Sequence, residues 1–189
     1  MGRADTRERI VGAASSALYR HGINATNVDA LASAAGVTKV TLYRHYRSKD
    51  ALLVDGLRRR HRERHETLTD LLADESVAPR ERLLCVFDWL GDWFAEEPFR
   101  GCAFVQALVE VGRDSDGVRL IAAEHKRAFA AALGGAAERA GAAKPTELAA
   151  QLQLLVEGAT VVAYATGRLK AALDARAAAE TLLTAHGLA

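Results

Sequence analysis

The chain has 189 residues, 50% of them hydrophobic, so it can bury a core as one large domain or two small ones. Its formal net charge of +1 hides a split: residues 1–64 hold 13 Lys and Arg against 6 Asp and Glu, whereas residues 65–189 hold 12 against 18. No long apolar run free of charges follows the charged start MGRADTRERI, which excludes a signal peptide and a membrane span and predicts a cytoplasmic protein.

Two helices are predicted at the start of the chain. Residues 6–21 carry apolar side chains at helical spacing along one stripe, which predicts the first helix. Thr6 is expected to cap this helix and Gly22 to end it. The second helix begins at Thr26 or Asn27, because both are good N-cap residues.

A third, short helix follows. Gly36 ends the second helix, since glycine adopts the left-handed backbone that a helix end needs, and Thr38 caps the third. Leu42 and Tyr46 lie one turn apart and point inward, whereas the opposite face carries cationic, aromatic and hydroxyl side chains. These faces, within the basic third of the chain, predict a helix-turn-helix whose third helix enters the DNA major groove.

Six further helices with short joints are predicted over the rest of the chain. Their expected ranges are 47–72, 79–96, 102–111, 118–140, 146–166 and 174–185. The basic run from Arg58 to His65 fits a solvated helix face better than a direct DNA contact. We therefore predict an all-α fold of about nine helices, with a helix-turn-helix DNA-binding domain over residues 1–50 and a helical ligand-binding and dimerisation domain over residues 51–189.

The predicted helix over residues 79–96 is apolar on nearly every side, so other helices must surround it. Aromatic side chains here and further along the chain fit either a plain core or the lining of an apolar cavity. The candidate ligand-binding residues are Phe87, Trp89, Trp93, Phe104, Leu108, His125, Phe129 and Tyr164. An apolar or aromatic small molecule is the expected ligand.

No catalytic or metal site is predicted. Cys85 and Cys102 sit in apolar runs and fit reduced core residues better than a redox switch. They form no CxxC motif. Of the six histidines, His61 and His65 are four apart and could bind a metal, but they lie in an arginine-rich helix that would repel a cation. No phosphate loop or pair of nucleophile and base is found either, so we expect no cofactor and no enzymatic activity.

The last two predicted helices carry small apolar side chains that allow helix backbones to approach closely. Two such helices from each of two chains would form a four-helix bundle with a two-fold interface. The predicted interface residues are Leu152, Val156, Ala159, Val162, Ala163, Ala178 and Leu182. Both helices could instead cover the core of a monomer. A homodimer is favoured, because a single short helix-turn-helix rarely supplies useful specific affinity.

Residues 6–53 closely resemble the TetR family of bacterial transcriptional regulators. Beyond the apolar stripe of the first helix, the resemblance rests on HG at 21–22, AT at 25–26, AAGVTKVTLYRHY at 34–46 and SKDALL at 48–53. It implies an all-helical homodimer whose first three helices bind double-stranded operator DNA. It also implies a small-molecule inducer site in the remaining helices and repression as the usual outcome.

The resemblance also implies which residues contact DNA. These are Thr26, Thr38, Lys39, Val40, Thr41, Tyr43, Arg44, His45 and Lys49. Lysines neutralise phosphates and hydroxyls donate to phosphate oxygens, so their chemistry fits this role. Thr41 and Arg44 are expected to contact base edges, and Val40 a thymine methyl.

Two positions depart from the family pattern. Val40 stands where a small residue or proline is common, which should change the bases tolerated at the centre of each half-site. Tyr46 stands where phenylalanine is common, and its hydroxyl is expected to reach a polar edge of the core. Two functions stay open: a ligand-responsive repressor, and a ligand-independent or architectural DNA-binding dimer that needs no pocket.

Overall fold

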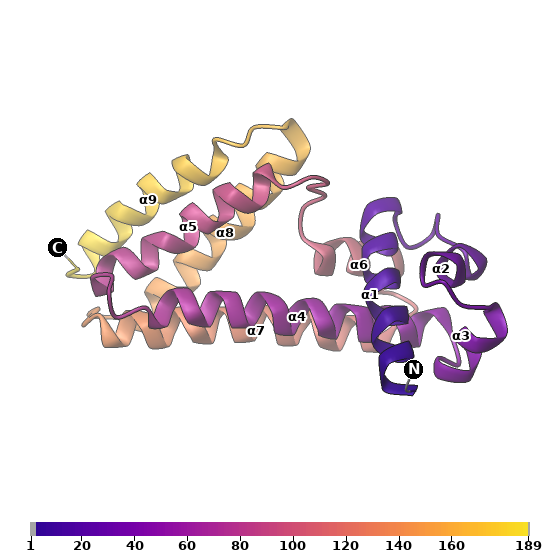
Figure 1. Cartoon of the computed structure of the whole chain (residues 1–189). Coiled ribbons are helices and arrows are strands. Elements are labelled where there is room, and N and C mark those ends of the chain that lie inside the picture. Colours follow the sequence, from indigo (N-terminus) through magenta and orange to yellow (C-terminus); the bar gives the residue numbers. More distant parts are fainter. Residues whose placement is uncertain (1–2, 189) are drawn as a thin grey trace. The chain divides into compact units, whose positions relative to one another are not determined.

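A computed structural model describes residues 3–188, which form nine α-helices and no strand (Figure 1). The helices are α1 (Arg3–His21), α2 (Val28–Ala34), α3 (Lys39–His45), α4 (Lys49–Ala73), α5 (Pro79–Ala95), α6 (Ala103–Val111), α7 (Asp116–Arg139), α8 (Pro145–Thr166) and α9 (Ala171–Ala185). The predicted all-α fold of about nine helices is confirmed for the described residues.

Three helices begin earlier than predicted. α1 extends further towards the N-terminus and places Thr6 inside the helix rather than at its cap. α7 begins early because the Ser115 hydroxyl accepts a hydrogen bond from the backbone N–H of Val118, at 3.1 Å. α9 begins before Asp174, whose carboxylate instead lies in the first turn and complements the helix dipole there.

The described residues divide into two compact units. Unit 1 comprises the chain up to Glu63 together with Ala103–His125. Unit 2 comprises Arg64–Cys102 together with the chain from Lys126 onward. α4 and α7 each contribute one part to either unit. The predicted domain boundary at residue 50 concerns the DNA-binding segment alone, and it stays a prediction.

Unit 1 is built around α1, α2, α3 and the start of α4. α1 packs on α2, and α2 on α3. The side chains that hold these helices together are almost wholly buried, at 0–1% exposed: Ile10, Leu31, Leu42 and Leu52. Each such side chain contributes about 1.5–3 kcal/mol on burial. One inward leucine on α3 therefore supplies much of what fixes that helix.

A hydrogen-bonded triad joins α1, the end of α3 and α4 within unit 1. The Tyr46 hydroxyl donates to Asp55 Oδ2 at 2.6 Å and accepts from Arg7 Nε at 3.1 Å. Arg7 also pairs with Asp55 at 2.9 Å. Burial, and the hydrogen bond to Asp55, raise the pKa of Tyr46 to about 12. The hydroxyl that distinguishes this position thus reaches a polar edge, as predicted.

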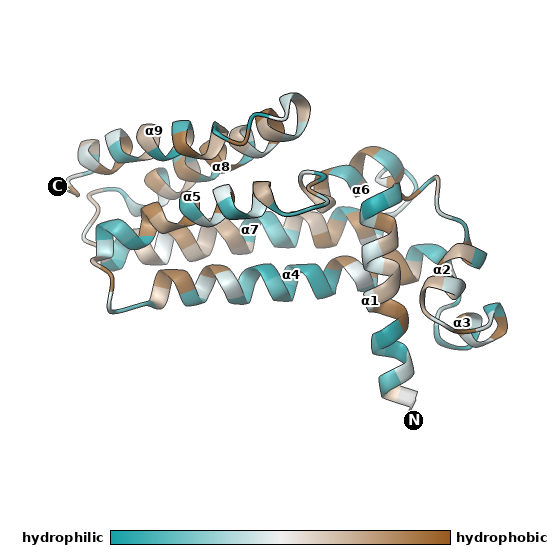
Figure 2. Ribbon diagram, turned by 45° about the horizontal axis from the view of Figure 1, so that its top comes forward, coloured by the Kyte–Doolittle hydropathy of each residue, from teal (hydrophilic) through white to brown (hydrophobic). Residues whose placement is uncertain are grey.

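Unit 2 is a helical bundle around α5. α5 packs on both α8 and α9, and α8 packs on α9. Phe87, Leu90 and Phe94 of α5 are buried in its core, as the all-round apolar sequence predicts. The middle of α4, in contrast, is largely hydrophilic (Figure 2).

By length and composition alone, α8 is the one described helix that could cross a membrane. Leu148 and Leu152 on its inner side are buried in the core of unit 2. Glu157, further along α8, forms an ion pair with Lys126 of α7. These contacts place one side of α8 in the core of unit 2.

Replacing Tyr46 with phenylalanine should lower the free energy of unfolding by about 0.5–1.5 kcal/mol, because Asp55 and Arg7 each lose a hydrogen bond. The raised pKa means that the folded wild type keeps the phenol proton after the unfolded chain has lost it. Wild-type stability should therefore fall as the pH rises from about 10 through the folded pKa of about 12, and Tyr46→Phe should lack this component.

Denaturant titrations across this pH range test both expectations, with Tyr43→Phe as the matched control. Tyr43 is 46% exposed, so loss of its hydroxyl should change nothing. Equal stability of the wild type and Tyr46→Phe at neutral pH would contradict a stabilising triad.

Candidate nucleic-acid interface

The two short helices of the helix-turn-helix are each fixed by a side-chain cap. Asn27 Oδ1 accepts from the backbone N–H of Ala30 at 2.8 Å and caps α2. Thr38 Oγ1 accepts from the N–H of Thr41 at 3.1 Å and caps α3. Gly36, between them, has a φ of +62°, the left-handed conformation predicted for the turn. Helices of 7 residues are marginal in water, so these caps matter.

The outward face of α3 carries four exposed side chains, Lys39, Val40, Tyr43 and Arg44. Val40 is 64% exposed and Tyr43 46%, whereas Leu42 on the opposite side is 1% exposed. The helix therefore presents cationic, apolar and phenolic groups to solvent while one leucine anchors it. This is the chemistry that contacts phosphates, thymine methyl groups and base edges.

The two threonines of α3 and its cap lie beside this face. Their hydroxyl oxygens are 2.9 Å apart, so Thr38 and Thr41 hydrogen-bond to each other. Thr41 is half-buried and Thr38 exposed. His45 is half-buried in the last turn of α3, where a positive charge complements the helix dipole.

Two of the predicted DNA-contacting side chains hydrogen-bond to backbone carbonyls within unit 1. Thr26 is 4% exposed, and its hydroxyl donates to the Gly22 carbonyl at 2.7 Å. The Lys49 ammonium is half-buried and donates to the Ile23 carbonyl. Both side chains hold the turn before α2, and their contact with DNA stays a prediction.

Lys39 forms an ion pair with Asp29 of α2, at 3.0 Å. Both side chains are more than half exposed, so the pair contributes at most about 1 kcal/mol. A phosphate could therefore take the place of Asp29 at little cost, which leaves Lys39 available to a polyanion.

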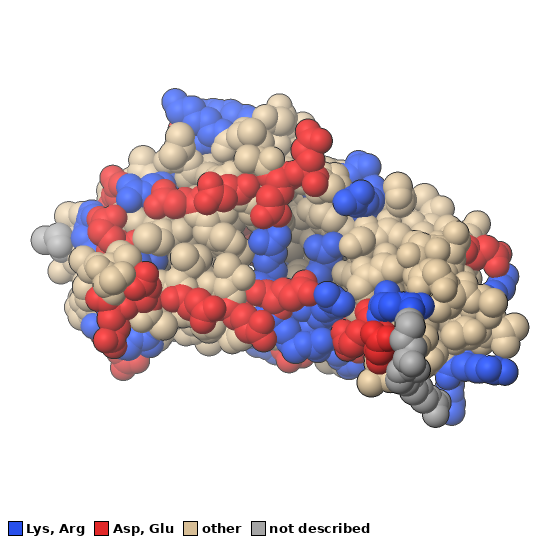
Figure 3. All heavy atoms as spheres, viewed as in Figure 1, with Lys and Arg blue, Asp and Glu red and all other residues tan. Residues whose placement is uncertain are grey.

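Charge is unevenly distributed over the surface. On the face shown in Figure 3, Asp and Glu side chains form rows along helices of unit 2, whereas Lys and Arg side chains protrude near α3. The basic run of α4 contributes less to the positive charge of the surface. Arg59 pairs with Glu8 and Glu63, and Arg60 donates to Ser15 Oγ at 3.0 Å. These contacts are intramolecular.

The predicted ligand-binding residues divide between the two units. Phe104, Leu108 and His125 lie in unit 1, and the other five in unit 2. Phe87, Phe104 and Phe129 are buried; Trp89, Trp93 and His125 are half-buried; Leu108 and Tyr164 are exposed. Three hollows lie beside Leu57 and Gln106, beside Asn24 and Ser115, and beside Thr69 and Arg139. None of the eight residues lines them.

Within unit 2, Phe99 joins two of the predicted pocket residues, Trp93 and Tyr164, in an aromatic chain. Phe99 makes edge contacts with Trp93 and Tyr164, at centroid distances of 5.2 and 6.4 Å. Arg64 lies over the rings of Trp93 and Trp89, at 4.6 and 5.3 Å. In unit 1, His125 stacks on Phe104 at 3.8 Å.

The predicted dimer residues also fall into two sets. Leu152, Val156, Ala159 and Ala163 are buried in the core of unit 2, and Leu182 is half-buried. Val162 and Ala178 are exposed. The same helices expose further apolar side chains, with Leu154 72%, Val161 59% and Leu173 59% exposed.

No group of three or more His, Cys, Asp or Glu side chains within residues 3–188 is arranged to hold a metal ion. Burial, together with Asp88 and Glu81 nearby, raises the pKa of the Cys85 thiol, which disfavours its reactive thiolate form. Cys102 is half-buried, with its Sγ atom 3.5 Å from Lys126 Nζ.

Comparison with known proteins gives a consistent answer. Residues 10–55 match the model of bacterial regulatory proteins of the tetR family. A crystal structure of a chain assigned to the TetR transcriptional regulators, from Streptomyces avermitilis, is 32% identical, with 97% of this chain and 99% of that one covered and a TM-score of 0.83. The chain belongs to the TetR family. The family that the sequence resembled is thus confirmed.

A second similar protein is NemR of Escherichia coli. Its crystal structure in the reduced form is 25% identical, covers 94% of this chain and 96% of NemR, and has a TM-score of 0.86. In sequence comparison, the HTH-type transcriptional repressor NemR of strain K12 is 28% identical over 116 residues. That match spans 61% of this chain and 58% of NemR.

Removing the cap of α3 should destabilise unit 1. Thr38→Ala leaves the N–H of Thr41 without its acceptor and should lower the free energy of unfolding by about 0.5–2 kcal/mol. Thr38→Ser keeps the hydroxyl and should stay close to the wild type. Denaturant unfolding of the three proteins measures the difference, and a loss of equal size in both variants would contradict a capping role.

Proposed function

We propose that the chain is a homodimeric transcriptional repressor in the cytoplasm that binds double-stranded operator DNA through α3 and is released by a small molecule. The outward face of α3 carries this proposal, because a capped helix exposes Lys39, Val40, Tyr43 and Arg44 while its other side is anchored in unit 1. Membership of a family of regulators supports it, as does the name of the similar E. coli protein, a repressor. No enzymatic role is proposed.

Each predicted contact has a distinct part in this binding. Arg44, exposed in the last turn of α3, would donate to a guanine edge, and Thr41 would contact a neighbouring base. Val40 would meet a thymine methyl. Lys39, Thr38 and Tyr43 would bind phosphates and so fix the helix in the groove, with His45 at the end of the same helix.

Dimerisation is proposed through the exposed sides of α8 and α9. Leu154, Val161 and Leu173 are more than half exposed, and together with Val162 and Ala178 they give these two helices an apolar outer surface. A side chain at Gly158 would meet nothing within 4 Å, so a helix of a second chain could approach closely there. A two-fold dimer presents two copies of α3 to successive major grooves, about 34–36 Å apart.

The small molecule is proposed to be apolar or aromatic and to bind among the predicted pocket residues of unit 2. The aromatic chain of Trp93, Phe99 and Tyr164, with Arg64 over the indole of Trp93, provides stacking surfaces and one cation in unit 2. A ligand-independent DNA-binding dimer is the alternative.

Two substitutions on α3 should affect DNA binding differently. Arg44→Ala should cost about 1–3 kcal/mol on the operator and relax the choice of one base pair, because it removes a base contact. Lys39→Ala should weaken binding to operator and random DNA alike and flatten the salt dependence, because it removes a phosphate contact. Titrations on both duplexes at several salt concentrations measure this. Equal losses on both duplexes for Arg44→Ala would falsify its role in base recognition.

A charge on the outer side of α8 should break the dimer. Leu154→Glu places a carboxylate in the proposed interface twice, once per chain, and should raise the dimer dissociation constant at least ~100-fold. Leu120→Glu is the control, since Leu120 of α7 is 68% exposed and lies in unit 1. Sedimentation across a concentration series distinguishes them. An unchanged dimer dissociation constant for Leu154→Glu would show that the interface lies elsewhere.

A further inference from the structure

An acidic side chain of α6 holds the turn that leads into the helix-turn-helix. Glu110 Oε2 accepts a hydrogen bond from the backbone N–H of Asn24 at 2.9 Å. The Asn24 side-chain amide in turn donates to the backbone carbonyl of Glu110 at 3.4 Å. Both residues lie in unit 1, 86 positions apart in the chain. The turn between α1 and α2 is thus bonded to α6 by two reciprocal contacts.

The same turn is bonded from its other side by α4. Lys49 donates to the carbonyl of Ile23, and the Thr26 hydroxyl closes the turn on the carbonyl of Gly22. Gly22 has a φ of +87°, and a Cβ atom there would lie 3.5 Å from each carboxylate oxygen of Glu110. A short segment that starts α2 is therefore held between a cation of α4 and a carboxylate of α6.

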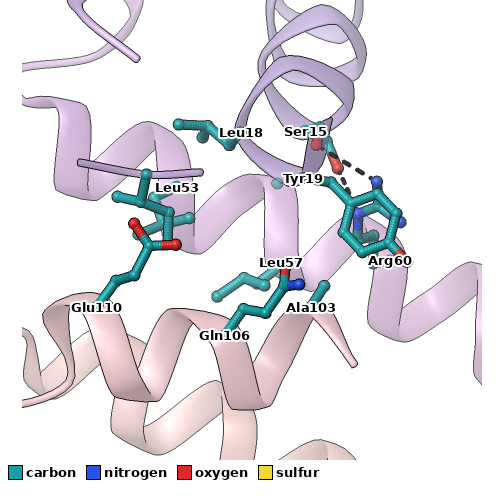
Figure 4. Close-up of a pocket in the computed structure, with 11 residues that line it drawn as sticks. Ser15, Leu18, Tyr19, Leu53, Leu57, Arg60, Ala103, Gln106 and Glu110 are labelled. Carbon is teal, nitrogen blue, oxygen red and sulfur yellow. Dashed lines mark hydrogen bonds between the residues drawn. The ribbon is translucent and has the colours of Figure 1, made fainter. Parts of the chain in front are cut away.

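Glu110 is the one charged residue of α6, whose sequence is otherwise apolar or neutral. Figure 4 shows Glu110 and Gln106 on the side of α6 that faces Leu53 and Leu57 of α4 and Leu18 of α1, around a small hollow. A half-buried carboxylate on an apolar helix loses hydration, and the Asn24 N–H replaces part of it. The contact with the turn before α2 therefore stabilises the Glu110 carboxylate on this helix.

We propose that Glu110 is a positioning residue that couples α6 to DNA binding. Its carboxylate holds the turn before α2, and α2 in turn packs on α3. The chain enters α6 directly from the last residue of the unit 2 segment, Cys102. Without the Glu110 carboxylate, the N–H of Asn24 loses its acceptor, the start of α2 is loosened and binding by α3 weakens. This coupling rests on the proposed function, because it acts on operator binding.

The charge of Glu110 makes the coupling testable by the sign of its effect. Loss of a negative charge from a DNA-binding unit increases its attraction to DNA in general, so a purely electrostatic role predicts tighter binding. Loss of the contact with Asn24 instead predicts weaker operator binding. The two explanations give opposite results for one substitution.

The experiment compares Glu110→Ala and the near-isosteric Glu110→Gln with a control, Glu124→Ala. Glu124 is an exposed acidic residue of α7 in unit 1, so its removal changes the net charge of the unit by the same amount. Operator and random duplexes are titrated with each full-length protein, and amide hydrogen exchange is followed at Asn24. Cooperative thermal unfolding confirms that each variant is folded.

Glu110→Ala should bind the operator about five- to tenfold more weakly, with random DNA bound at least as well as by the wild type. Glu110→Gln keeps an acceptor oxygen, so its affinity for the operator should lie between those of Glu110→Ala and the wild type. Glu124→Ala should bind the operator at least as tightly as the wild type. Exchange at Asn24 should be at least ~10-fold faster in Glu110→Ala than in the control.

Operator binding by Glu110→Ala at the wild-type level or tighter would overturn the coupling and leave the proposed function intact. Slow exchange at Asn24 in that variant would overturn the contact itself. A wild type that forms no specific DNA complex would instead overturn the proposed function, and the exchange measurement would still decide whether Glu110 holds the turn.

Discussion

A helix of 7 residues has too few intrahelical hydrogen bonds to persist alone in water, and α3 is that short. Its conformation therefore depends on what surrounds it: the Thr38 cap at its start, Leu42 buried beneath it, and Tyr46 bonded to Asp55 just after its end. Each of these contacts uses the inner side or an end of the helix. The outer side carries only exposed contacts such as the weak ion pair of Lys39 with Asp29. It can therefore present Lys39, Val40, Tyr43 and Arg44 to solvent.

The turn before α2 likewise depends on contacts from outside the helix-turn-helix. Lys49 and Glu110 bond this turn from α4 and α6, so the position of the helix-turn-helix depends on helices whose residues lie far along the chain. In unit 2, by contrast, the arrangement depends on burial of α5 and on Arg176 of α9, which pairs with Glu81 and Asp88 of α5 at 3.1 Å. Unit 2 is thus a conventional apolar bundle with ion pairs at its edge.

Local signals predicted the helices well. Gly22 and Gly36, the caps at Asn27 and Thr38, and the prolines that open α5 and α8 all act within a few residues, so the sequence pattern shows them directly. The early start of α7 shows the limit of this approach. Ser115 is a good cap, but it lies in a polar run in which Ser115, Asp114 and Asp116 are all plausible caps.

Contacts between distant residues could not be predicted. Nothing in the sequence pairs Glu110 with Asn24, or Arg7 with Asp55. α8 gives a second example, because it is apolar on two sides. The stripe through Leu152, Val156 and Ala159 faces the core, and that through Leu154, Gly158 and Val161 faces out. Hydropathy alone cannot decide which stripe is buried, and four of the predicted dimer residues, Leu152, Val156, Ala159 and Ala163, lie in the core of unit 2.

The most direct test of the account is selection of bound sequences from a random duplex library by the purified full-length chain at moderate salt. A dimer that presents two copies of α3 should recover a two-fold-symmetric site with half-sites about one helical turn apart or slightly more. A base preference lost with Arg44→Ala should map to the same position in both half-sites. Recovery of no symmetric motif would contradict specific operator binding by a dimer and favour an architectural DNA-binding role.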